Sequence, residues 1–281
     1  MRILLTGSTG FLGKYVMKEL AERKLEVIAA IRTIPKKAAG NIKYVEFDLA
    51  LLNENENYFE YFDRPDLCIH LAWEGLPNFK DEFHLRDNLP RHFLFLANLL
   101  RNGLRELTVT GTCLEYGIKE GELSEEMDCS PVTAYGEAKL ELFRRLEPLA
   151  TKHGASLKWL RLFYMFGEGQ NERSLIPQLE KALLRGDESF PMSGGEQQRD
   201  FLPVETIADY IVQLALRPDW TGISNVCSGR PQKVKAFVNE YLKNKGRKIN
   251  LQTGVYPYPD YEPMAFWGST ARLNKLLKNK N

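Results

Sequence analysis

Short apolar runs alternate with longer amphipathic stretches through the first 163 residues of the chain. Six runs rich in Val, Ile and Leu are expected to form strands, namely residues 2–6, 26–31, 43–47, 67–72, 107–111 and 157–163. Between them, apolar residues recur at helical spacing near 11–23, 83–102 and 132–153. Apolar strands separated by helices are typical of a parallel sheet covered on both faces. The pattern therefore predicts an α/β fold with a doubly wound parallel sheet.

The alternation changes after Phe163, where loops and shorter elements begin. We expect helices near 174–185 and 233–243, an apolar element over 201–216 and a strand near 224–228. The chain is expected to divide into a sheet domain, residues 1–163, and a smaller C-terminal lobe, residues 164–281. Because the chain is expected to return to the sheet around 204–230, the boundary between the two is not clean.

Three glycines, Gly7, Gly10 and Gly13, lie between the first strand and the first helix in the order G-x-x-G-x-x-G. Glycine at these positions permits a tight turn, a close approach of the backbone to a pyrophosphate, and close packing of helix on strand. The helix N-terminus then presents free N–H groups and a positive dipole end to phosphates. This context predicts a Rossmann-type dinucleotide site.

The end of the second strand indicates which dinucleotide is bound. Sites specific for NAD place an acidic side chain there, but this chain has Arg32 and Thr33. A cation and a hydroxyl suit a 2′-phosphate, which favours NADP(H); the alternative is that Arg32 only ends the strand in solvent. Asp48 follows the third strand, where it either accepts a hydrogen bond from the adenine amino group or is a plain turn carboxylate.

Composition narrows the classes of partner. The chain has 281 residues, 43% of them hydrophobic and 27% charged, with a formal net charge of +1. No excess of Lys and Arg exists to neutralise phosphates, so we expect neither nucleic acid nor a membrane as partner. Four cysteines without a CxxC pair predict free thiols and no metal site. No signal peptide or membrane-spanning stretch is apparent, and we expect a cytoplasmic protein.

A tyrosine and a lysine four residues apart are the main catalytic candidates. Tyr135 and Lys139 lie in an amphipathic segment, so both side chains share one helical face, and Ser130 or Thr133 is expected to cap it. A nearby ammonium is expected to lower the phenol pKa from about 10 toward the working pH. Thr112 follows the fifth strand, at the edge where open α/β sheets hold their ligands.

The stretches TGSTGFLG, HLAW, TGTCLEYG and YGEAK together resemble the extended short-chain dehydrogenase/reductase family, which acts mostly on nucleotide sugars. The resemblance implies that Thr112, Tyr135 and Lys139 are catalytic and that Lys139 also binds the nicotinamide ribose. It further implies a homodimer formed through the helices near 83–102 and 132–153. The coenzyme contacts predicted in this way are Gly7, Thr9, Gly10, Phe11, Leu12, Gly13, Arg32, Asp48, Leu49, Leu71, Ala72, Tyr135 and Lys139. The predicted substrate contacts are Trp73, Thr112, Asn171, Arg199 for the diphosphate, and Trp267.

Differences from the motifs of related enzymes exclude some of the family's reactions. Nucleotide-sugar dehydratases have an Asp-Glu pair after the catalytic threonine, whereas here Cys113 and Leu114 follow Thr112. Leu114 also stands where coupled epimerase–reductases have a cysteine. The resemblance is strongest to bacterial reductases of dTDP- and CDP-linked 4-keto-6-deoxyhexoses, such as those forming dTDP-fucose and CDP-abequose. We therefore expect NADPH-dependent reduction of such a 4-keto group in deoxysugar biosynthesis. An NAD-retaining 4-epimerase is the alternative, and a non-catalytic dinucleotide-binding regulator is a remote one.

Overall fold

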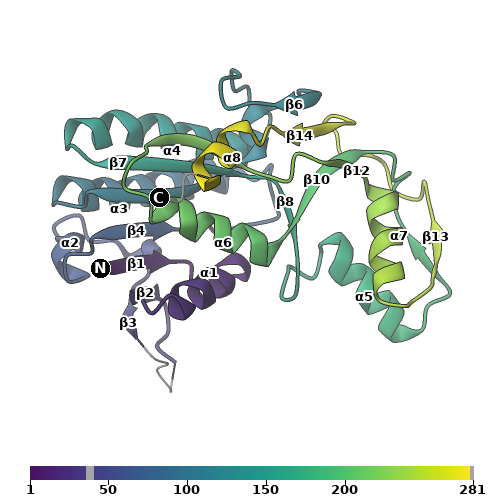
Figure 1. Cartoon of the computed structure of the whole chain (residues 1–281), viewed down its shortest axis with the longest axis horizontal. Coiled ribbons are helices and arrows are strands. Elements are labelled where there is room, and N and C mark those ends of the chain that lie inside the picture. The colour runs from purple at the N-terminus through teal and green to yellow at the C-terminus, as the bar shows by residue number, and fades with distance from the viewer. Residues whose placement is uncertain (36–40, 279–281) are drawn as a thin grey trace.

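A seven-stranded parallel sheet forms the centre of the computed structural model, which describes residues 1–35 and 41–278 (Figure 1). Its strands are β1 (Arg2–Thr6), β2 (Glu26–Ile31), β3 (Ile42–Glu46), β4 (Leu67–His70), β5 (Glu106–Thr112), β7 (Ser156–Leu162) and β11 (Gly222–Val226). They run in the order β11-β7-β5-β4-β1-β2-β3, so the direction of winding reverses between β1 and β4. The carboxyl ends of the strands flanking such a switch point are where doubly wound sheets bind ligands. The predicted Rossmann-type fold is confirmed.

Helices cover both faces of this sheet (Figure 1). One face carries α1 (Phe11–Glu22), α6 (Val204–Ala215) and α8 (Ala271–Lys278), and the other carries α2 (Tyr58–Tyr61), α3 (Leu89–Arg101) and α4 (Ala134–Lys152). Successive side chains of a strand point to opposite faces. Accordingly, Leu4 of β1 packs in the core under α3, while Leu5 packs in the core under α1 and α6.

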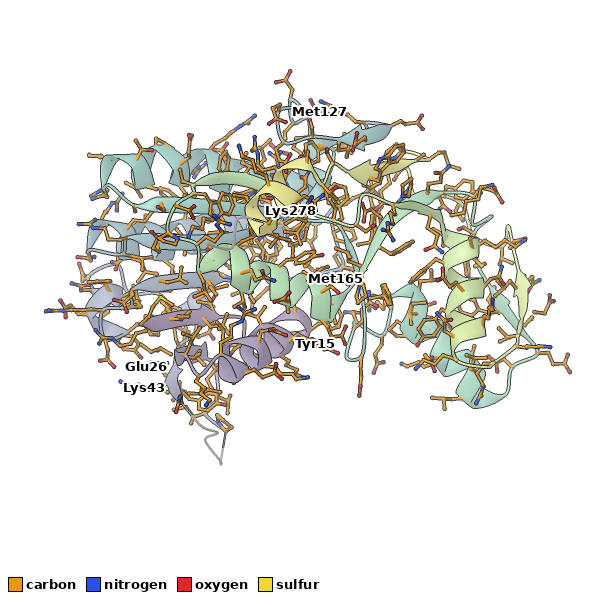
Figure 2. All side chains as sticks on the ribbon, in the orientation of Figure 1. Tyr15, Glu26, Lys43, Met127, Met165 and Lys278 are labelled. Carbon is orange, nitrogen blue, oxygen red and sulfur yellow. The ribbon has the colours of Figure 1, made fainter. Side chains whose placement is uncertain are left out.

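The second lobe is smaller and has its own core, formed chiefly between α5 (Leu175–Arg185) and α7 (Val234–Asn244). Its strands are β8 (Tyr164–Phe166), β9 (Ser189–Pro191), β10 (Gln198–Pro203), β12 (Pro231–Lys233) and β13 (Asn250–Gln252). A separate pair, β6 (Gly121–Leu123) and β14 (Phe266–Gly268), joins the two parts of the chain. Tyr15 lies at the end of α1 nearest this lobe (Figure 2), where its hydroxyl donates to the carbonyl of Glu168 at 2.9 Å.

Several elements differ from the sequence-based expectation. The apolar stretch 201–216 divides at Pro203 into the end of β10 and the helix α6. The helix expected over 83–102 begins as a π-helical turn, η2 (His84–Asn88), and continues as α3. Most strands of the second lobe are three residues long, too short for an alternating pattern to reveal. The domain boundary at residue 163 stays a prediction.

Within the described part of the chain, no helix is both long and apolar enough to cross a membrane.

Candidate active site

The glycine loop packs its backbone directly against neighbouring backbone. A Cβ atom at Gly13 would lie 2.0 Å from the carbonyl oxygen of Gly7, so only glycine brings α1 this close to β1. Gly7 has a φ of +73°, and a Cβ there would lie 2.7 Å from the nitrogen of Ala72. The loop after β1 therefore touches the loop after β4, which carries the predicted contacts Leu71 and Ala72.

The N-terminus of α1 has the unsatisfied donors that a pyrophosphate requires. Gly10 is the N-cap residue and no side chain caps the helix. The hydroxyl of Ser8 is buried and has no hydrogen-bond partner among the residues that the structure describes. Free N–H groups and the positive end of the helix dipole make this a site for anions. These residues fit the phosphates of a dinucleotide, with the predicted contacts Thr9, Phe11 and Leu12 along the same turn.

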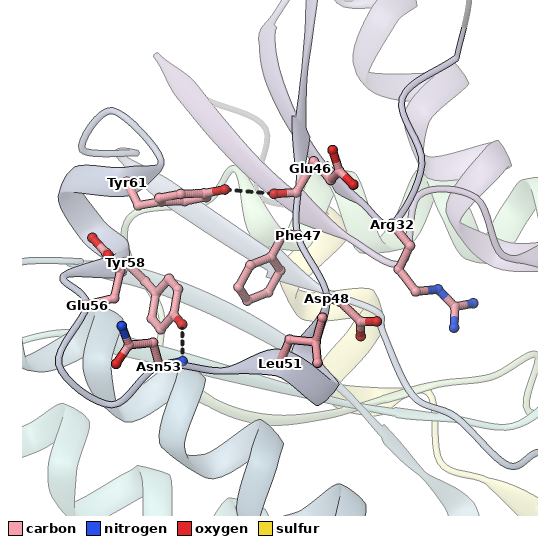
Figure 3. A pocket seen from close by; sticks show the side chains of 9 residues that line it. All are labelled: Arg32, Glu46, Phe47, Asp48, Leu51, Asn53, Glu56, Tyr58 and Tyr61. Carbon is pink, nitrogen blue, oxygen red and sulfur yellow. Dashed lines mark hydrogen bonds between the residues drawn. The ribbon is translucent and has the colours of Figure 1, made fainter.

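The expected adenosine end of the site carries carboxylates as well as Arg32, and carboxylates disfavour a 2′-phosphate. Arg32 is exposed and forms an ion pair with Glu74 at 3.0 Å. The carboxylate of Asp48 accepts the N–H of Ala50 at 2.9 Å and so caps the short 3-10 helix η1 (Leu49–Leu51). Beside them is a cavity of about 340 Å³ (Figure 3). Its lining residues are Arg32, Glu46, Phe47, Asp48, Leu51, Asn53, Glu56, Tyr58 and Tyr61.

Thr112, Tyr135 and Lys139 meet at the carboxyl edge of the sheet, and all three are buried. Thr112 ends β5, and α4 carries the other two residues. The hydroxyl of Thr133 accepts the N–H of Gly136 at 3.1 Å, so Thr133 rather than Ser130 caps α4. The Thr112 hydroxyl lies on the Tyr135 side of the site and lowers the pKa of the phenol.

Electrostatics at this site differ from the expectation for Tyr135. Burial raises the pKa of its phenol, the carboxylate of Glu115 raises it further, and the Thr112 hydroxyl lowers it. The expectation that the phenol pKa falls toward the working pH is wrong, because the ammonium of Lys139, 6.0 Å from the centroid of the phenol ring and donating to the Thr110 carbonyl at 2.9 Å, does not offset the effect of burial. Burial also lowers the pKa of Lys139 to about 7. Tyr135 is therefore a protonated phenol, the form that can donate a proton.

Glu115 is a central residue of the site that the sequence analysis overlooked. Its fully buried carboxylate accepts the N–H of Thr112 at 2.8 Å, Nε1 of Trp159 at 3.0 Å and Nε of Arg161 at 2.7 Å. It closes a capping box with Thr112 at the start of η3 (Cys113–Tyr116). The T-x-x-E spacing of residues 112–115 is the sequence signal of such a box.

Of the predicted substrate contacts, Trp73 lies next to Tyr135, with ring centroids 5.9 Å apart. Arg199 is buried in the second lobe, where its guanidinium pairs with Glu262 at 2.8 Å and lies over the Phe266 ring. Asn171 is exposed, and its side chain accepts the N–H of Arg173 at 2.9 Å. Trp267 lies on β14 opposite Glu122. Of these residues, Trp73 thus lies in contact with Tyr135, whereas the guanidinium of Arg199 is paired with the carboxylate of Glu262.

A second cavity, of about 260 Å³, lies beside the start of α4. It is lined by residues 77–81 and by Tyr261. Phe79 links it to the site, because its carbonyl accepts the N–H of Tyr135 at 3.0 Å and the two rings lie 5.7 Å apart. Lys80 forms an ion pair with Asp260 at 2.7 Å and so ties this loop to the second lobe.

Comparison with known proteins adds independent observations. Residues 3–227 match the model of the NAD dependent epimerase/dehydratase family. The chain is 29% identical over 272 residues to a dTDP-6-deoxy-L-talose 4-dehydrogenase (NAD(+)) from Aggregatibacter actinomycetemcomitans, covering 96% of this chain and all of that one. It is 28% identical to a GDP-6-deoxy-D-talose 4-dehydrogenase from the same organism, over 82% of this chain and 75% of the relative. The solved structure of MoeE5 with UDP-glucuronic acid and NAD shares the fold, with a TM-score of 0.81, 24% identity and coverage of 99% and 92% of the two chains.

Proposed function

The chain belongs to the NAD dependent epimerase/dehydratase family, and on that premise we propose that it reduces the 4-keto group of a nucleoside-diphosphate 4-keto-6-deoxyhexose. The observation that carries the proposal is the buried pair of Thr112 and Tyr135 at the carboxyl edge of the sheet, where the Thr112 hydroxyl lowers the pKa of the phenol. Two relatives support it, because both are named as 4-dehydrogenases of nucleotide-linked 6-deoxytaloses, and that oxidation is the reverse of a 4-keto reduction. The nucleotide is proposed to be dTDP or CDP.

The mechanism assigns one step to each side chain. A bound reduced nicotinamide dinucleotide supplies the hydride for the sugar carbon. The Thr112 hydroxyl holds the substrate oxygen, and Tyr135, a protonated phenol, donates its proton to the alkoxide that forms there. The ammonium of Lys139 then stabilises the tyrosinate that is left. Burial of all three residues strengthens these interactions by excluding water.

The test is to incubate the protein with dTDP-, CDP-, GDP- and UDP-linked 4-keto-6-deoxyhexoses and to follow oxidation of NADPH and NADH. Consumption with one of them supports the proposal, and no consumption with any of the four contradicts it. A 4-epimerase is the second candidate, because enzymes of that activity are among the relatives. Tightly retained coenzyme in the absorbance spectrum, together with interconversion of the C4 epimers of a UDP-sugar, would favour it instead.

We propose that the protein prefers NADPH to NADH and that Arg32 is the residue that determines this preference. We expect Arg32→Asp to shift the ratio of kcat/KM for NADPH over NADH toward NADH, because a carboxylate repels a 2′-phosphate and accepts from a ribose hydroxyl. Glu74→Gln is the matched control: it frees Arg32 from its ion pair and should shift the ratio toward NADPH. An unchanged ratio in both variants would remove Arg32 from the coenzyme site.

Arg199 is proposed to bind the substrate diphosphate, which requires the guanidinium to leave Glu262. We expect Arg199→Ala to weaken nucleoside-diphosphate binding about 10- to 100-fold, the value of a charge-assisted hydrogen bond. Calorimetric titration with dTDP measures this. Glu262→Gln frees the guanidinium and should tighten binding; affinities equal to that of the unaltered protein in both variants would make Arg199 purely structural.

We further propose a cytoplasmic homodimer formed through α3 and α4, where Leu94 of α3 is exposed. Sedimentation of the purified protein tests the oligomeric state.

A further inference from the structure

Trp73, the third residue after β4, is fixed by three aromatic neighbours. Its indole N–H donates to Nδ1 of His84 at 3.1 Å. Its ring stacks on the buried ring of His92, with centroids 4.5 Å apart and planes inclined by 24°. Its ring centroid lies 5.9 Å from that of Tyr135, with the two planes inclined by 65°. Because Nε2 of His84 donates to the carbonyl of Asn78 at 3.1 Å, the acceptor role of Nδ1 follows from the hydrogen-bond network.

A π-helical turn places the residues that hold the Trp73 loop. In η2 (His84–Asn88) one residue more than usual fits the turn, a feature found mostly at functional sites. The turn brings both of its terminal side chains to the loop after β4. Asn88 donates through Nδ2 to the carbonyl of Glu74 at 2.9 Å, while His84 accepts from Trp73.

The face of the Trp73 ring covers the ammonium of Lys139. The Nζ atom lies 4.0 Å from the ring centroid, well within the range of a cation–π contact. One carbonyl, that of Thr110, accepts from the same ammonium. Within the described ranges 1–35 and 41–278, no carboxylate forms an ion pair with Lys139, although its side chain is only 2% exposed. The indole face is therefore a principal partner of a buried cation.

We propose that Trp73 is a positioning residue for Lys139, whose indole face keeps the buried ammonium charged and directed toward the site of Tyr135. The inference rests on the proposed function, because a charged Lys139 is what stabilises the tyrosinate after proton transfer. It assigns Trp73 a role different from the sugar-packing role expected from the sequence. A neutral lysine there would leave the tyrosinate without a counter-charge.

The protonation of Lys139 can be followed near pH 7, because the histidines and the tyrosine around it stay neutral there. Burial lowers its pKa to about 7, and the Glu115 carboxylate raises it. Burial lowers the pKa values of His70, His84 and His92, which are therefore neutral around pH 7. The pKa of Tyr135 is raised, so its phenol is neutral too. Lys139 thus loses its proton as the pH rises through about 7, and loss of the π face should move this transition to lower pH.

The first test is the pH profile of kcat/KM for the 4-keto sugar. In Trp73→Leu the alkaline limb should move about one pH unit lower. Trp73→Phe keeps a π face and loses only the N–H donor, so its limb should move by less than half as much. Trp220→Leu is the matched control, because it removes another partly buried indole whose N–H donates to the Leu214 carbonyl. A lower kcat in Trp73→Leu with an unmoved limb would overturn the inference.

The second test needs no turnover. Protein labelled with ¹³C at lysine Cε is titrated by NMR, and Lys139 is the resonance missing from Lys139→Arg. Its midpoint should be lower in Trp73→Leu than in Trp73→Phe or Trp220→Leu, with folding checked by thermal melts. Trp73→Met, which also lacks a π face, replaces Trp73→Leu if the latter does not fold. Equal midpoints overturn the inference. A lowered midpoint in a protein that reduces no 4-keto sugar supports it and counts against the proposed function alone.

Discussion

Tyr135→Phe is expected to bind coenzyme and nucleotide sugar and to lose about 10²- to 10⁴-fold in kcat, the range for loss of a general acid. The substitution removes one hydroxyl and leaves the ring in place. That ring packs against Phe79, Trp73 and His84, with centroid distances of 5.7, 5.9 and 5.3 Å. The effect should therefore appear in kcat rather than in stability or in coenzyme affinity.

Single-turnover reduction and calorimetric titration of coenzyme separate these quantities. Thr112→Ser is the matched control, since it keeps the hydroxyl that lowers the pKa of the Tyr135 phenol and should retain most turnover. Thr112→Val removes that hydroxyl and should fall between Thr112→Ser and Tyr135→Phe. Near-normal turnover of Tyr135→Phe would show that the phenol is not the proton donor.

The parts of the site that follow from local sequence patterns were predictable. The strands β1 and β2 coincide with the expected ranges because both are continuous apolar runs. The glycine loop follows from spacing, and the common face of Tyr135 and Lys139 follows from helical periodicity. Each of these features is determined by residues close together in the chain.

Features that depend on long-range contacts were not predictable. Glu262, 63 residues after Arg199, neutralises the cation expected to meet a phosphate. The ion pair between Arg32 and Glu74 joins residues 42 positions apart and alters the charge at the coenzyme end. Burial and the Glu115 carboxylate raise the pKa of Tyr135, and the spacing of Tyr135 and Lys139 in the sequence indicates neither the burial nor the carboxylate. Periodicity identifies which side chains share a face, but not which partners the fold brings to them.

Glu115→Ala is expected to lower the free energy of unfolding by about 3–5 kcal/mol, because it leaves a buried cation unpaired. The guanidinium of Arg161 is almost completely buried and loses the ion pair that it forms with Glu115. The N–H groups of Thr112 and Trp159 lose their acceptor as well. Urea denaturation of the coenzyme-free protein measures the loss.

Two further variants identify the cause of that loss. Glu115→Gln keeps an acceptor oxygen for Thr112 and should cost less than Glu115→Ala. A double substitution, Glu115→Leu with Arg161→Met, removes both charges and should recover part of the stability, because two apolar side chains leave no unpaired ion. Glu115→Gln should also lower the pH at which Lys139 deprotonates, since the carboxylate raises the pKa of that lysine. If Glu115→Ala unfolds within about 1 kcal/mol of the unaltered protein, water must reach Arg161, and the site is less enclosed than its burial indicates.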